Sequence, residues 1–140
     1  MTAERTRRLM RWVMAVFYGA AGFVHLASPD AFLSIVPGWV PYPHDVILIT
    51  GVCEIAGAVA LVTRQLRWWA GVMLALYAVC VLPANIKHAF ENVQVTGFPT
   101  SWWYHAPRLA FQPVLVWWAL FAGGVVNWPK RHRAAPRDPN

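Results

Sequence analysis

Six polar side chains interrupt the long apolar segments of this 140-residue chain. They are His25, Glu54, Asn85, His88, Arg108 and Gln112. Ionisable groups within such segments are rare, usually face the interior of a helix bundle, and point to function by default. Together they could bind the polar head of a small molecule, with a carboxyl group as the central acid or hydrogen-bond anchor.

Glu54 is the most informative of the six. It lies eight residues into the segment 46–62, which is about 12 Å along a helix and therefore close to the middle of a bilayer core about 30 Å thick. A carboxyl group at that depth must be protonated or paired. Gly51 and Ala58 share its helical face, and small residues allow close helix packing. We therefore expect Glu54 to point into the bundle at a tight crossing.

Arg108 is the expected partner of Glu54. Pro107 is typical of the first position of a helix, and this would place Arg108 at a helix N-terminus, where the dipole disfavours a cation. An anion should compensate, and Glu91 and Asp30 are shallower alternatives to Glu54. We therefore predict that Glu54 and Arg108 meet, directly or through a bridging group.

The depths of the six residues form one pattern. His25, His88 and Arg108 lie near one rim of their segments, and Asn85 and Gln112 lie about one turn deeper. The pattern predicts an outward-opening polar pocket with a carboxylate at its floor. One alternative is a purely structural cluster that fastens the helices through hydrogen bonds. Another is a proton-coupled carrier, which the lack of polar residues in the opposite half disfavours.

Composition makes the bilayer the natural solvent for this chain. Hydrophobic residues make up 58% of it and charged residues 13%, against about 45–50% and about 25% in ordinary globular domains. Four apolar segments cover residues 9–27, 46–62, 68–90 and 109–126, and each has about the length needed to cross a membrane. The predicted fold is an all-α bundle of four transmembrane helices, with a short interfacial helix near Pro29 in the first outer loop.

The basic residues indicate orientation. Ten of the 12 Lys and Arg residues flank one side of the four segments, so the positive-inside rule places both termini in the cytoplasm. We therefore expect a basic N-terminus (1–8), one membrane domain (9–128) and a basic tail (129–140). The charges lie in separate clusters at the segment ends, which argues against nucleic acid as a partner.

The cysteines and histidines point to no known motif. Cys53 and Cys80 are the only cysteines, and without a C-x-x-C motif they are best interpreted as small apolar fillers. Four histidines gather on the outer side, namely His25, His44, His88 and His105. Their spacing fits no metal motif, so we predict no metal site. Nucleotide-binding and hydrolase motifs are also absent from the sequence.

Several motifs resemble the DoxX-like family of small membrane proteins. Residues 50–58 read T-G-V-C-E-I-A-G-A, residues 83–85 read P-A-N, and residues 108–112 read R-L-A-F-Q. The stretch 22–41, which begins G-F-V-H and ends P-G-W-V-P, resembles the start of the same family. The resemblance covers most of the chain and implies a four-helix membrane fold.

The resemblance also implies a functional setting. Members of the wider group are linked to sulfur and quinone oxidation and to oxidative-stress complexes. For this chain it implies a bacterial inner-membrane protein that binds a quinone or other lipid-like ligand or supports a membrane or periplasmic redox partner. The chain lacks the cysteine pairs of some redox-associated relatives. Enzymatic activity and self-association into a homo-oligomer stay open.

Overall fold

The structure is a computed structural model that describes residues 3–91, 93–95 and 97–127. All regular structure in these residues is helical. The elements are α1 (Ala3–Ala27), the 3₁₀ helix η1 (Pro29–Ile35), α2 (Pro43–Val62), α3 (Arg67–Cys80), α4 (Leu82–Phe90) and α5 (Trp102–Gly123). The all-α prediction is therefore confirmed. The predicted basic tail, 129–140, lies outside the described residues.

Three of the described helical stretches are long and apolar enough to cross a membrane. They are Glu4–Ala27, Pro43–Val62 and Arg67–Phe90. They coincide with three of the four predicted spans and give the chain the character of a membrane protein. The fourth predicted span, 109–126, falls largely in α5, which is not among the three. Tryptophan, proline, arginine and glutamine lower the hydropathy of α5.

Two prolines bear on where the helices are divided or begin. The third span is divided at Val81 into α3 and α4, because Pro83 lacks an N–H and its ring crowds the carbonyl four residues earlier. The last helix begins at Trp102 rather than at Pro107, since the Ser101 side chain accepts a hydrogen bond from the Trp103 N–H at 3.3 Å. Arg108 is therefore in the second turn of α5, and not at its N-terminus.

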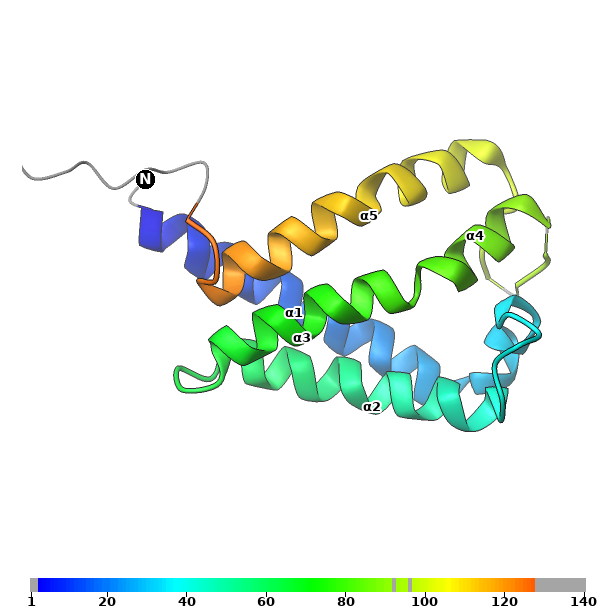
Figure 1. Cartoon of the computed structure of the whole chain (residues 1–140), viewed down its shortest axis with the longest axis horizontal. Coiled ribbons are helices and arrows are strands. Elements are labelled where there is room, and N and C mark those ends of the chain that lie inside the picture. Colours follow the sequence, from blue (N-terminus) through cyan, green and yellow to red (C-terminus); the bar gives the residue numbers. More distant parts are fainter. Residues whose placement is uncertain (1–2, 92, 96, 128–140) are drawn as a thin grey trace, which may run out of the picture.

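The helices pack in two tight pairs, α1 with α2 and α3 with α5 (Figure 1). Met14, Leu61 and Leu74 are buried at the centre, where these pairs meet. Near the N-terminus α1 lies close to the end of α5, and the two helices diverge toward the end that carries α4 and η1 (Figure 1). This divergence leaves room between the helices at the end where the polar residues were predicted.

Glycine makes the α1–α2 crossing close. A Cβ atom on Gly22 would lie 2.6 Å from the Gly51 carbonyl oxygen, and a Cβ atom on Gly51 would lie 3.0 Å from the Cβ of His25. Neither glycine can carry a side chain without moving a backbone. The expectation of a tight crossing on the Gly51 face is confirmed, and this crossing places Glu54 beside α1.

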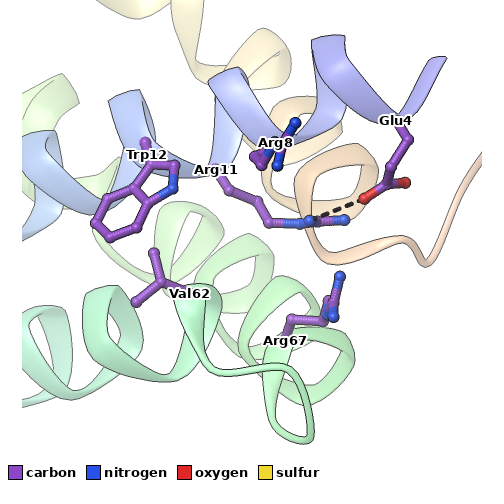
Figure 2. Close-up of a pocket in the computed structure, with 6 residues that line it drawn as sticks. All are labelled: Glu4, Arg8, Arg11, Trp12, Val62 and Arg67. Carbon is purple, nitrogen blue, oxygen red and sulfur yellow. Dashed lines mark hydrogen bonds and ion pairs between the residues drawn. The ribbon is translucent and has the colours of Figure 1, made fainter. Parts of the chain in front are cut away.

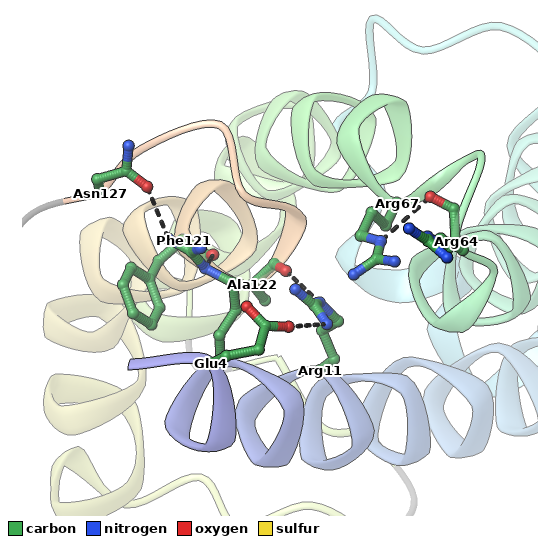
Figure 3. Close-up of polar contacts among 8 residues, drawn as sticks. Glu4, Arg11, Arg64, Arg67, Phe121, Ala122 and Asn127 are labelled. Atoms are coloured by element: carbon green, nitrogen blue, oxygen red, sulfur yellow. Dashed lines mark hydrogen bonds and ion pairs between the residues drawn. The ribbon is translucent and has the colours of Figure 1, made fainter. Parts of the chain in front are cut away.

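Hydrogen bonds from α1 hold the C-terminal end of α5. Arg7 Nε donates to the Phe121 carbonyl at 2.9 Å, and Arg11 Nε donates to the Ala122 carbonyl at 2.7 Å (Figure 3). These carbonyls belong to the last turn of α5, where backbone acceptors lack partners within the helix. Cations are also favourable at that end of the helix dipole. The two helices are thereby fixed together at the arginine-rich end.

Candidate functional site

A cavity of about 900 Å³ opens between the diverging helices. Its lining comes mainly from α1 and α5, with fewer residues from η1, α2, α3 and α4, and it is mostly apolar. Five of the six predicted site residues line it, namely His25, Glu54, Asn85, Arg108 and Gln112. The volume falls within the range of small-molecule sites, about 300–1,000 Å³. The structure therefore brings the predicted polar residues to one cavity.

His88 is the sixth predicted residue, and it lies behind the cavity wall. Its Nδ1 is 2.8 Å from Arg108 Nη1. A guanidinium only donates hydrogen bonds, so Nδ1 must accept, and the neutral ring carries its proton on Nε2. His88 therefore positions the Arg108 side chain and does not itself face the cavity.

One wall of the cavity carries an acid–imidazole pair. Glu54 Oε2 lies 2.7 Å from His25 Nδ1, and Glu54 is only 4% exposed. The distance is that of a hydrogen bond, in which the proton is donated either by Nδ1–H of the imidazole ring or by the carboxylic acid. The Phe32 ring of η1 packs on the His25 ring with centroids 4.3 Å apart. The pair is thus fixed by the helix crossing and by η1.

Tyr77 belongs to the same wall and was missed by the sequence analysis. Its side chain lies close enough to Glu54 to interact with it electrostatically, and it also lines the cavity. A tyrosine inside an apolar span usually places its hydroxyl against a polar partner. This rule could have associated Tyr77 with Glu54.

The opposite wall carries a cation. Arg108 Nη2 donates to the Asn85 side-chain oxygen, and the guanidinium lies over the Tyr104 ring at 5.6 Å from its centroid. Gln112, one turn further along α5, donates to the Ala78 carbonyl at 2.7 Å, close to the break between α3 and α4. The contacts of Arg108 with Asn85, His88 and Tyr104 therefore fix its side chain without an acidic partner.

The direct form of the predicted pairing between Glu54 and Arg108 is not what the structure shows. Among the described residues, no ion pair or hydrogen bond joins the two; Glu54 pairs with His25, and Arg108 bonds to Asn85 and His88. The Gly51 crossing places Glu54 against α1, and the helix dipole no longer opposes Arg108 in the second turn of α5. Arg108 therefore faces the cavity with no described carboxylate bonded to it.

His105 is a second feature that the sequence analysis did not connect to the site. Its ring centroid lies 4.7 Å from that of His88, and both residues are 1% exposed. Neither ring nitrogen of His105 has a hydrogen-bond partner in the described part of the chain. His105 therefore packs as a buried ring against His88, which binds Arg108.

Residues 14–123 match a protein family described as "Domain of unknown function (DUF8561)". The chain belongs to the DUF8561 family. No curated protein and no solved structure matches it. The DUF8561 match includes all six predicted site residues and the Gly22–Gly51 crossing, and it begins after the arginines of the first turns of α1.

The cysteines of this DUF8561 chain lie apart from the cavity. Cys53 and Cys80 are free thiols on exposed surfaces of their helices, so they do not fill the core as the sequence analysis expected. Glu54, which follows Cys53, and Ala78, two residues before Cys80, are both buried. Among the described residues, no three His, Cys, Asp or Glu side chains gather as they would around a metal ion.

Proposed function

We propose that this DUF8561 protein binds a lipid-like or quinone-like molecule in the cavity, with the oxygen atoms of the ligand head against Arg108. The observation that carries the proposal is a guanidinium that faces a mostly apolar cavity with only neutral partners. Charges removed from water are normally paired. A carboxylate, phosphate or quinone oxygen would use the N–H donors that Asn85 and His88 leave free.

The two walls have different roles in this proposal. Arg108 and Asn85 recognise the ligand head, while His25 and Glu54 offer a shared proton on the other side. Apolar side chains such as Phe17 and Phe111 line the rest of the cavity and accommodate a hydrocarbon or isoprenoid tail. Such an arrangement of few polar groups in an apolar site is typical of small-molecule binding.

A binding experiment tests the proposal. Displacement of a fluorescent fatty acid from the detergent-purified chain would measure the affinities for palmitate and for a short-chain quinone. We expect Arg108→Gln to weaken the preferred probe about tenfold or more, because a hydrogen bond to a charged group contributes about 1.5–3 kcal/mol. Ala21→Phe, which fills the cavity, should abolish binding.

Ala56→Phe is the matched control, because Ala56 lies on the exposed face of α2 away from the cavity. It should leave the affinity unchanged. Equal binding by the wild type, Arg108→Gln and Ala21→Phe would contradict a ligand site in the cavity.

We also propose that α5 completes a four-span bundle in a bacterial inner membrane, with both termini in the cytoplasm. The arginines near the N-terminus and at 64 and 67 lie at the same end of the molecule, as the positive-inside rule requires. α5 also packs along the full candidate span that contains α3. Reporter fusions at Asp30, Arg64 and the C-terminus test the orientation, and an extracytoplasmic C-terminus would contradict it.

A second candidate function is that of an assembly factor without a ligand. It is favoured by the bonds that hold the helices together, His25 to Glu54 and Gln112 to Ala78. The DoxX-like motifs add the proposal that the partner is a membrane redox protein. This function predicts that neither the wild type nor any variant binds the fatty acid or the quinone. It also predicts that Arg108→Gln weakens the capture of a partner protein.

A further inference from the structure

A second, smaller pocket lies at the arginine-rich end of the molecule. Its volume is about 240 Å³, and it is formed where the first turns of α1 face the end of α2 and the start of α3. The lining residues are Glu4, Arg8, Arg11, Trp12, Val62 and Arg67 (Figure 2). None of them lines the large cavity, so the two sites are separate.

The pocket has an excess of positive charge. Among the described residues that line it, three are arginines and Glu4 is the one carboxylate. Glu4 accepts from Arg11 Nη1 at 3.2 Å, and its side chain is 64% exposed. The charges of Arg11 and Arg67 repel each other. The pocket therefore holds cations that one exposed carboxylate does not neutralise.

One of the three arginines is held by the protein, and the other two can bind an anion. Arg11 is 8% exposed, and its Nε is bound to the Ala122 carbonyl (Figure 3). Arg67 donates from Nε to the Arg64 carbonyl at 3.1 Å, and no other residue in the described part of the chain accepts from its terminal nitrogens, which can therefore bind an anion. Arg8 is exposed at the rim of the pocket. Arg8 and Arg67 thus lie on either side of Arg11 (Figure 2).

We propose that this pocket binds the phosphate of an anionic phospholipid head group. Guanidinium groups recognise phosphate oxygens through paired hydrogen bonds, and basic pockets between membrane helices bind such head groups. Trp12 and Val62 carry apolar surface from the pocket onto the exposed sides of α1 and α2. That surface fits the first part of an acyl chain, and a free phosphate ion would leave it uncovered.

The test uses the full chain in a non-ionic detergent, with the unfolding temperature followed at increasing ligand concentration. Three ligands are compared: phosphatidylglycerol, phosphatidylcholine with the same acyl chains, and inorganic phosphate. We expect phosphatidylglycerol to stabilise the chain most. Arg8→Gln and Arg67→Gln should each raise its apparent dissociation constant about fivefold, since one basic residue near an anionic lipid surface contributes about 1 kcal/mol.

Arg5→Gln is the matched control, because Arg5 is an exposed arginine of the same helix that does not line the pocket. It should change the constant less than twofold, and Arg67→Lys should keep part of the affinity if Arg67→Gln also lowers stability. The proposal would be overturned if phosphatidylglycerol stabilised the chain no more than phosphatidylcholine does. It would also be overturned if Arg5→Gln weakened phosphatidylglycerol binding as much as Arg8→Gln and Arg67→Gln do. Stabilisation by inorganic phosphate alone, with the same dependence on Arg8 and Arg67, would confirm the phosphate site and assign it to a soluble anion.

Discussion

The pairing of His25 with Glu54 makes a quantitative prediction about stability. The two side chains meet at 2.7 Å, and Glu54 is almost completely buried. A hydrogen bond that involves a charged group contributes about 1.5–3 kcal/mol. Removal of one side chain leaves the other buried without a hydrogen-bond partner, which lowers the free energy of unfolding further. Replacement of both by apolar groups of similar size often changes the free energy of unfolding little.

A double-mutant cycle with His25→Leu and Glu54→Met measures this coupling. Each single variant should lower the free energy of unfolding by about 2 kcal/mol. The double variant should cost clearly less than the sum, with a coupling of about 1–3 kcal/mol. Denaturant unfolding at constant detergent concentration, followed by circular dichroism, gives the four free energies.

A second cycle with Glu54→Met and Arg108→Met is the control. The structure predicts that these two variants are additive within about 0.5 kcal/mol, as expected for residues that share no bond. Additive losses at His25 and Glu54, together with strong coupling between Glu54 and Arg108, would refute the pairing described here. That result would restore the pair expected from the sequence.

Two further predictions concern packing and the thiols. Gly22→Ala should destabilise the chain by about 1–3 kcal/mol, measured by thermal or denaturant unfolding. The reason is that the new Cβ would lie 2.6 Å from the Gly51 carbonyl oxygen, and overpacking costs about this much. An unchanged stability would show that the two helices cross less closely than described. Replacement of both Cys53 and Cys80 by Ala should change the free energy of unfolding by less than about 1 kcal/mol and leave the ligand affinity unchanged. Both cysteines are exposed and lie apart from the cavity. Loss of ligand binding at normal stability would show that the thiols carry chemistry.

Local sequence patterns were sufficient for the helices and for part of the site. The apolar segments predicted the helices, and Gly51 predicted the face of α2 on which Glu54 lies. The pairing partner was not predictable in the same way, because it depends on which helix crosses α2 at Gly51. That crossing favours His25, which the sequence analysis placed at the rim of the pocket.

The start of the last helix shows a related limit. Pro107 is typical of a first helical position, but the cap at Ser101 extends the helix by more than a turn before it. A proline early in a helix removes only one bond of the first turns, so the local pattern did not exclude this longer helix. The position of Arg108 relative to the helix dipole changed as a result.

The arginine-rich end was interpreted from the sequence only as a sign of orientation. The structure adds that Arg8, Arg11 and Arg67, which come from two distant segments, line one pocket. Charge counts along a chain predict which side of a membrane a loop occupies. They do not predict that side chains from different segments share a cavity, since this depends on how the helices pack.

A high-resolution structure of the chain in lipid nanodiscs, with lipids and waters built, tests the central claim most directly. We expect an elongated molecule in the large cavity, with an oxygen atom of its head within hydrogen-bonding distance of the Arg108 guanidinium and its tail between α1 and α5. His25 and Glu54 should remain paired on the opposite wall. A closed cavity, or one in which Arg108 turns to bind Glu54 directly and no ligand is present, would contradict the account.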